Sequence, residues 1–280
     1  MLVSDLLCDK QLEDSSISAF LVNINGLSFS SGYEISGTRS LLDKANKYNK
    51  LIIFNLNLYY EENDLALVIK FIEDYKDDNC LFLTNTIGLL TLANKEKFIY
   101  QGNKILTNHL DIDFYQDYCD SVVIANEITY DDILDIVNNT TINKGIEVFG
   151  HLLLSVSKRH FLSYYFDQIN SKDDSNDIYY LQEEKRDYLM PIIQNCHGSK
   201  IYTPYLIDMI NELHYLNENF KYLFLNSFDI AVDKYLLTCE LFNAYLDDSS
   251  INIKDQLIDI YSDVFSSGFL YKKTTLIKED

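Results

Sequence analysis

A histidine and two cations, suited to proton transfer and anion binding, follow one short apolar segment of this chain. The segment Ile146–Phe149 is typical of a buried strand, and His151 stands just after it. Imidazole titrates near neutral pH, so His151 is a candidate for acid–base catalysis, the alternative being a structural histidine with satisfied hydrogen bonds. Lys158 and Arg159 follow, and their cations could hold a phosphate or a carboxylate. The alternative for this pair is a salt-bridged helix start facing Asp167 or the acidic hairpin.

Two carboxylates lie in or near predicted strands. Glu127 ends one strand, and Glu147 lies within the Ile146–Phe149 strand. If both point into one barrel, they form an acid/base pair of the kind that hydrolases use. The alternative is that Glu147 is bonded to a neighbouring lysine or arginine. Glu127, Glu147 and His151 are therefore the candidate catalytic residues.

The other titratable residues give no pattern for a metal or a cofactor. The remaining histidines, His109, His160, His197 and His214, lack the spacing of zinc ligands. The five cysteines are scattered without a C-x-x-C pair, as expected for reduced thiols. The sequence also lacks a phosphate-binding glycine loop and the G-x-S-x-G motif of serine hydrolases. We expect no metal and no cofactor.

The formal charge of −20 over 280 residues limits the choice of partners. A protein that binds nucleic acid by itself normally presents a basic surface, so work on RNA would require a partner that supplies cations. The N-terminal segment lacks the features of a secretory signal, and no apolar run reaches the ~18 residues of a membrane span. We therefore expect a cytoplasmic protein without membrane contact.

Short apolar runs alternate with helical patterns along the whole chain. Eight strands are predicted, at Leu2–Leu6, Phe20–Ile24, Leu51–Leu56, Leu81–Thr84, Phe98–Tyr100, Val122–Ala125, Ile146–Phe149 and Tyr222–Leu225. Continuous apolar runs are typical of parallel strands that are covered on both faces. The prediction is an α/β fold, a (β/α)8 TIM-like barrel that is irregular in its first units, with residues 1–280 forming one domain.

Helices and one insertion complete the predicted architecture. The expected helices are Glu61–Tyr75, Thr129–Asn139, Thr203–Phe220, Asp229–Asp247 and Asn252–Phe265. A β-hairpin is expected after the seventh strand, at about residues 170–203, with a turn at His197–Gly198. The polar segment Asn170–Asp177 is a candidate flexible stretch, and residues 250–280 form a C-terminal helix and tail.

Asparagine dominates the positions where the predicted strands end. In a parallel barrel the functional face lies at these ends. The residues found there include Asn25, Asn55, Asn57, Asn85, Asn103, Asn126 and Asn226. Asparagine forms hydrogen bonds but cannot act as a general base or a nucleophile. The pattern indicates a binding pocket with few catalytic groups.

The segment Gly145–Phe166 resembles the collagenase-like peptidase family U-32, whose signature reads Glu-Val-Phe-x-His-Gly and then Ser-x-Arg. The first part is matched from Glu147 to His151, with Leu152 in place of the glycine. The second part is matched by Ser157–Arg159, whose Ser-Lys-Arg is similar to the short, cysteine-poor branch of that family.

Further segments are similar to elements of the same family and occur in the same order: Thr84–Leu90, Leu106–His109, Val122–Thr129, Glu183–Ile192 and Ser266–Thr274. Asn85 stands where the family has aspartate and Asn126 where it has arginine, while Glu127 is kept. The resemblance adds Asn85 and Asn108 to Lys158 and Arg159 as expected substrate- or anion-binding residues.

The resemblance implies a role in the hydroxylation of the tRNA wobble uridine to 5-hydroxyuridine. The cysteines that hold an iron–sulfur centre in catalytic family members have no counterparts, and Cys196 is solitary. A degenerate, non-catalytic subunit is therefore implied, which acts with a longer iron–sulfur paralogue and meets tRNA only through that complex. A small-molecule carboxylate is a further expected ligand. The alternative is an active U-32 peptidase that cleaves unfolded or collagen-like protein.

Overall fold

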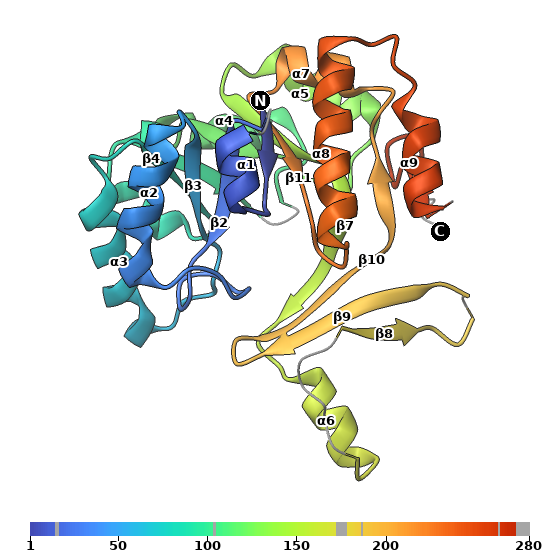
Figure 1. The fold of residues 1–280 in the computed structure, drawn as a ribbon. Helices are drawn as coiled ribbons and strands as arrows, with labels where there is room; N and C mark the ends of the chain where they lie inside the picture. The colour runs from blue at the N-terminus through green and yellow to red at the C-terminus, as the bar shows by residue number, and fades with distance from the viewer. Residues whose placement is uncertain (15–16, 103–104, 172–177, 186, 263, 273–280) are drawn as a thin grey trace, which may run out of the picture.

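Eight parallel strands close into a barrel with helices on its outside (Figure 1). The computed structural model describes residues 1–14, 17–102, 105–171, 178–185, 187–262 and 264–272. The ring contains β1 (Leu2–Ser4), β2 (Ala19–Asn23), β3 (Leu51–Leu56), β4 (Cys80–Thr84), β5 (Phe98–Gln101), β6 (Ser121–Val123), β7 (Asn143–Ser157) and β11 (Tyr222–Leu225). Strand β11 pairs with both β1 and β7, which closes the ring. The predicted (β/α)8 TIM-like fold is confirmed.

The helices that follow the strands differ greatly in length. They are α1 (Asp9–Asp14), α2 (Thr38–Lys47), α3 (Glu62–Tyr75), α4 (His109–Asp113), α5 (Tyr130–Asn139), α7 (Leu213–Asn219), α8 (Val232–Asp247) and α9 (Ile253–Tyr261). Four 3-10 helices join them: η1 (Ile35–Gly37), η2 (Ile87–Thr91), η3 (Lys95–Lys97) and η4 (Phe114–Asp117). The predicted helices at Glu61–Tyr75 and Thr129–Asn139 form, and each begins with a reciprocal capping box.

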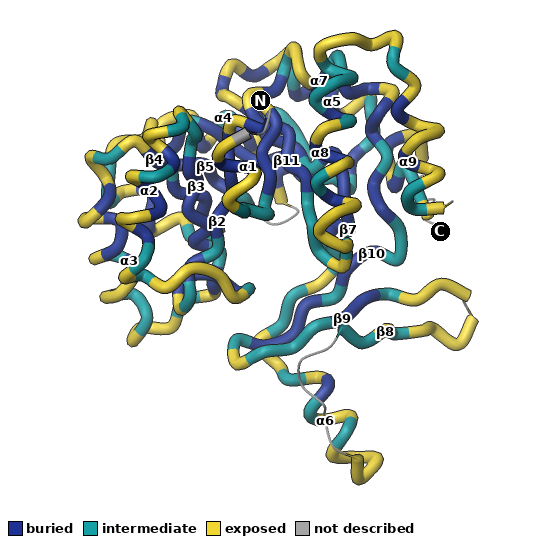
Figure 2. Tube along the Cα trace, viewed as in Figure 1, coloured by how far each residue is buried: buried dark blue, intermediate teal, exposed yellow. Residues whose placement is uncertain are grey.

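The barrel is filled with side chains rather than hollow. One buried cluster lies inside the ring and consists of Val3, Ala19, Ile53, Leu83, Ile99, Val123, Tyr222 and Phe224. A larger cluster fills the layer between strands and helices. Figure 2 shows the buried residues concentrated on the barrel strands. Packed layers of this kind leave space for a ligand only at the ends of the barrel.

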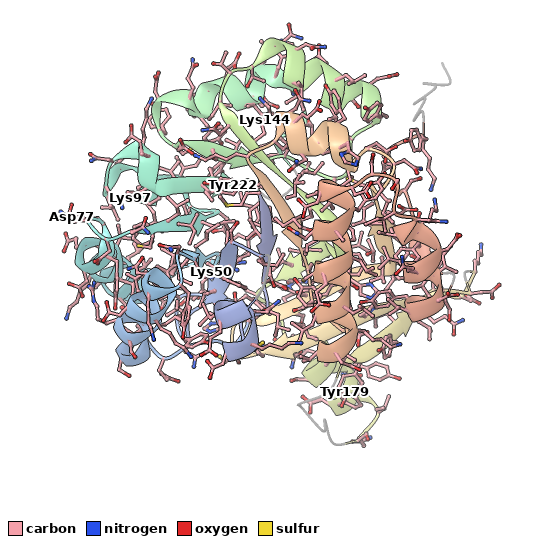
Figure 3. All side chains as sticks on the ribbon, turned by 45° about the horizontal axis from the view of Figure 1, so that its top comes forward. Lys50, Asp77, Lys97, Lys144, Tyr179 and Tyr222 are labelled. Carbon is pink, nitrogen blue, oxygen red and sulfur yellow. The ribbon has the colours of Figure 1, made fainter. Side chains whose placement is uncertain are left out.

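Lysine side chains bind backbone carbonyls at the end of the barrel where the strands begin. Figure 3 looks toward this end, with Tyr222 between the lysines. The Lys50 Nζ donates to the carbonyl of Ile17 at 2.8 Å, and the Lys144 Nζ donates to Ile142 at 3.0 Å. Both lysine pKa values are lowered by burial. Because these ammonium groups are hydrogen-bonded to backbone carbonyls, they have a structural role.

Strand β7 is much longer than predicted. It was expected to end at Phe149 but continues through Ser157, first parallel to β6 and β11 and then antiparallel to β10 (Gly198–Asp208). The change occurs at Gly150, which has φ +110°. A Cβ there would collide with the backbone carbonyl of Asn226. Glycine therefore permits the bend by which β7 leaves the barrel.

The outer half of β7 supports an extension below the barrel in Figure 1, which we call the arm. The arm contains α6 (Phe161–Gln168), β8 (Tyr179–Gln182), β9 (Leu189–Asn195) and the first half of β10. Strands β8, β9 and β10 pair antiparallel, with a turn before Gly198, so the predicted hairpin after the seventh strand is confirmed. Residues 172–177 of the expected flexible stretch and residues 273–280 of the expected tail lie outside the described residues.

The expected helix Thr203–Phe220 is wrong in its first half. Residues through Asp208 belong to β10, which pairs with β7 and also with β12 (Phe265–Ser266). Pro204 falls where the register between β10 and β7 shifts, a place where a missing N–H is tolerated. Only Leu213–Asn219 is helical.

Candidate functional site

A cavity of about 650 Å³ lies at the end of the barrel where the strands finish. Its floor is formed by the ends of barrel strands, and the outer half of β7 together with β10 forms one wall. A cavity of this volume is large enough for a small metabolite. Because parallel barrels place their sites at this end, the cavity is the candidate functional site.

Amide side chains form much of the floor. Asn55 Nδ2 donates to Asn23 Oδ1 at 2.9 Å, and Asn126 Nδ2 donates to the carbonyl of Glu147 at 2.7 Å. Asn226 belongs to the same floor, and its Nδ2 donates to the carbonyl of His151 at 3.2 Å. The predicted concentration of asparagine at the strand ends is therefore present in the cavity.

One floor asparagine has an unsatisfied acceptor. The Asn55 side chain is only 7% exposed, and its Oδ1 has no hydrogen-bond partner among the described residues. A buried acceptor without a donor costs about 1–3 kcal/mol. Water or a ligand hydroxyl in the cavity would remove this cost.

Both predicted catalytic carboxylates line the cavity. Glu127 follows β6, and Glu147 lies in β7, where Gln101 Nε2 donates to its Oε1 at 3.4 Å. A third carboxyl group, Asp5 at the end of β1, was not found from the sequence. It accepts a hydrogen bond from the Ser227 amide at 2.8 Å, and burial raises the pKa of Asp5 to about 6. The cavity is therefore lined by three carboxyl groups, and Asp5 is the one whose pKa is raised by burial.

Lys200 and Tyr202 on β10 were also missed from the sequence. They lie two residues apart on one strand and both line the cavity. The Lys200 ammonium lies 4.4 Å from the centre of the Phe29 ring, and burial lowers the pKa of Lys200 to about 8. The Tyr202 ring stacks on Phe228 at 3.8 Å, and burial raises the pKa of Tyr202. Both residues fall within the predicted hairpin at about residues 170–203, where the alternating Lys-x-Tyr pattern could have indicated that the two side chains share one face of a strand.

His151 lies next to the cavity but is not one of its lining residues. Its Nδ1–H donates to the carbonyl of Thr203 at 2.7 Å, and its ring meets Phe228 edge to face. Burial lowers the pKa of His151, so the imidazole is neutral at pH 7. These contacts fit a structural histidine that joins β7 to β10.

Lys158 and Arg159 lie on the arm, outside the cavity lining. The Lys158 ammonium binds the Glu61 carboxylate at 3.0 Å, and both side chains are largely exposed. Arg159 follows β7, and its backbone carbonyl accepts a hydrogen bond from Ser199. The structure therefore separates these two cations from the carboxylates Glu127 and Glu147.

Asn85 and Asn108 also lie outside the cavity lining. Asn85 Nδ2 donates to the carbonyl of Asn57 at 3.0 Å. Asn108 caps α4, because its side-chain oxygen accepts from the Asp111 amide at 3.0 Å. Both contacts stabilise loops at the mouth of the barrel.

The described cysteines and possible metal ligands do not form a reactive centre in the cavity. No group of three histidine, cysteine or acidic side chains is placed to hold a metal ion within the described part of the chain. Cys196 is exposed in the turn of the arm, while burial raises the pKa of Cys80, Cys119 and Cys239 to about 12. Among the described helices, none is both long and apolar enough to cross a membrane.

Comparison with known proteins identifies the family. The sequence model of peptidase family U32 matches residues 30–279. The chain belongs to peptidase family U32. This confirms the family resemblance seen in the signature from Glu147 to Arg159. The U32 peptidase Mk0906 is a similar solved structure, matched over 80% of this chain and 91% of that chain, with 10% identity and a TM-score of 0.47. A search of curated proteins finds no match to this U32 chain.

Proposed function

We propose that this U32 chain is a non-catalytic subunit of the system that makes 5-hydroxyuridine at the tRNA wobble position. The observation that carries the proposal is the composition of the cavity. Beside apolar side chains, its described lining offers amides, carboxyl groups, hydroxyls and one lysine, without a histidine or cysteine. A Ser–His or Cys–His pair is the usual source of an activated nucleophile. The cavity is therefore equipped to bind a ligand rather than to hydrolyse a peptide bond.

The proposed partner is a longer U32 paralogue that carries an iron–sulfur cluster. Hydroxylation of a uracil ring is an oxidation, and the described residues of this chain supply no metal group for it. The charge of −20 also makes direct binding of tRNA unfavourable. The paralogue would supply both the redox centre and the basic surface, in the cytoplasm, where tRNA is modified.

The predicted anion contacts remain part of this proposal. Lys158 and Arg159 lie together on the arm, where Lys158 is bound only at the surface by Glu61. An exposed ion pair of this kind contributes at most about 1 kcal/mol, so a phosphate or a carboxylate could replace Glu61. In this arrangement the arm, rather than the cavity, would meet the anion.

Deletion of the gene tests the proposal. Bulk tRNA from the deletion strain should lose 5-hydroxyuridine derivatives, and the intact gene should restore them. A tagged chain purified from its own cells should retain a longer, cysteine-containing U32 protein. Unchanged tRNA nucleosides in the deletion strain would contradict the proposal.

A peptidase is the second candidate, and one observation favours it. Glu127 and Glu147 line the same cavity, as an acid/base pair requires. The purified chain would then cleave gelatin or an unfolded protein, and Glu127→Gln would abolish the cleavage. Absence of cleavage by the intact chain would remove this candidate.

A further inference from the structure

Lys200 is a buried amine held rigidly in the wall of the cavity. Its backbone lies between two partners in the sheet, opposite Val156 of β7 and Ile193 of β9. The residue is only 7% exposed. Its ammonium lies over the Phe29 ring, 4.4 Å from the ring centre. Burial of an amine destabilises the folded state, so the presence of Lys200 in the cavity wall suggests a chemical role.

The environment keeps part of the Lys200 population unprotonated at neutral pH. Burial lowers the pKa of Lys200 to about 8, and the negative charge of Glu147 opposes this shift. At pH 7 about one such amine in ten is neutral, against about three in ten thousand for a lysine with a pKa of 10.5. Only the neutral amine is a nucleophile, and a desolvated lysine in an apolar site is the form that attacks carbonyl groups.

Other groups on the same wall could handle the proton and the hydroxyl of such a reaction. The carboxyl group of Glu147 is close enough to influence both Lys200 and Tyr202 electrostatically. The unsatisfied Oδ1 of Asn55 needs a donor, which a ligand hydroxyl can supply. Nucleophile, proton donor and hydrogen-bond acceptor thus line one cavity.

We propose that Lys200 captures a small aldehyde or ketone in this cavity as a reversible imine. The ligand class is a neutral, hydroxyl-bearing carbonyl compound. Three carboxyl groups line the cavity, those of Asp5, Glu127 and Glu147, and they oppose an anionic ligand. The floor amides offer hydrogen bonds to hydroxyl groups. This activity goes beyond the proposed role in tRNA modification and does not depend on it.

The reaction needs no oxidant or reductant. The Nζ lone pair forms a bond to the carbonyl carbon, the C=O π electrons move to oxygen, and a proton passes from nitrogen to that oxygen. A carboxyl group of the cavity then protonates the hydroxyl, which leaves as water while the nitrogen lone pair forms the C=N bond. The carboxylate takes the remaining N–H proton from the resulting iminium ion, which restores the carboxyl group and gives the imine. The balance is one amine and one carbonyl giving one imine and one water, and hydrolysis reverses it.

Reductive trapping on the purified full chain tests this proposal. The chain is incubated with glyceraldehyde and sodium cyanoborohydride at pH 7, and modified lysines are located by peptide mass spectrometry. Lys200 should be modified at least about 100-fold faster than the exposed Lys76, because its neutral fraction is larger. The Lys200→Met chain should lose the fast phase, and the matched Lys76→Met chain should keep it.

Measurements on the wild-type chain keep the test independent of how the variant folds. The labelling rate of Lys200 should rise with pH and level off above about 8. Labelling at similar rates on Lys200 and Lys76, or no labelling of Lys200, would overturn the proposal. Faster trapping of glyoxylate than of glyceraldehyde would overturn the neutral ligand class. Neither result bears on the tRNA assay, so the two proposals fail separately.

Discussion

Lys200 of β10 and Glu147 of β7 line one cavity, and the negative charge of Glu147 opposes the lowering of the Lys200 pKa. The two strands pair with each other beyond the end of the barrel, so the arm brings a cation to the carboxylates of the barrel. This relationship makes the arm a part of the site. It also means that the protonation of Lys200 responds to the charge of Glu147.

Replacement of Lys200 by methionine should stabilise the protein at neutral pH. The folded-state pKa of about 8 lies below the ordinary 10.5, so the unfolded chain binds this proton more tightly. This difference lowers the free energy of unfolding. The loss is fully present below pH 8 and disappears as the pH rises to 10.5. Lys200→Met should therefore raise the free energy of unfolding by about 1–3 kcal/mol at pH 7, with the gain lost near pH 10.5. Urea unfolding measures this, with Lys76→Met as control; a less stable Lys200→Met chain at pH 7 would refute it.

The buried carboxyl group of Asp5 should give the opposite dependence on pH. Its folded-state pKa of about 6 lies above the ordinary 3.8, so its contribution to stability is full below pH 3.8 and is lost as the pH rises through 6. Asp5→Asn keeps the acceptor for the Ser227 amide and removes the charge. It should raise the free energy of unfolding by about 1–3 kcal/mol at pH 7 and by little at acidic pH. An equal gain at both pH values would show that ionisation is not the cause; the exposed Asp43→Asn is the matched control.

Gly150→Ala should destabilise the junction between barrel and arm. The residue has φ +110°, and an added Cβ would meet the backbone of Asn226. Strain of this kind costs at least about 2 kcal/mol in the free energy of unfolding. Gly88→Ala is the control, since nothing lies within 4 Å of the position its Cβ would take. Equal urea midpoints for the two variants would mean that the bend at Gly150 is not required.

Much of the barrel could be predicted from the sequence because its strands are continuous apolar runs. All eight predicted strands are found in the ring, and the capped helices such as Glu61–Tyr75 follow. The outer half of β7 was missed, and the second half of β10 was wrongly predicted as helix, because strand pairing beyond the barrel leaves no continuous buried run. Most residues of β7 after Phe149 are only partly buried, and Pro204 interrupts β10.

The site was predictable only in part for a similar reason. Glu127 and the asparagines stand at strand ends and Glu147 within the seventh predicted strand, and these positions in the chain predict the mouth of the barrel. Asp5 also stands at a strand end, in the predicted strand Leu2–Leu6, and was missed. Lys200 and Tyr202 reach the cavity because β10 pairs with the outer half of β7, which was not predicted. Lys158 and Arg159 could not be placed either, because the arm carries them away from the barrel.

Variants of Asn108 separate a capping role from anion binding. Aspartate is as good a helix N-cap as asparagine, while alanine loses about 1 kcal/mol. If Asn108 acts through the cap on α4, Asn108→Asp should keep both stability and the level of tRNA modification, and Asn108→Ala should lower stability alone. Loss of modification in a stable Asn108→Asp chain would instead assign this position to an anion. Urea unfolding and tRNA nucleoside analysis provide the two measurements.

The most direct test of a non-catalytic role in tRNA modification is mass spectrometry of tRNA nucleosides from a deletion strain. Three versions of the deletion strain are compared: one without a complementing gene, one with the wild-type gene and one with the Glu127→Gln gene. The account predicts that 5-hydroxyuridine derivatives disappear without the gene and return with both copies, since Glu127 need not transfer a proton in a non-catalytic subunit. Unchanged nucleosides in the deletion strain would contradict the role in tRNA, and failure of Glu127→Gln alone would contradict the non-catalytic assignment.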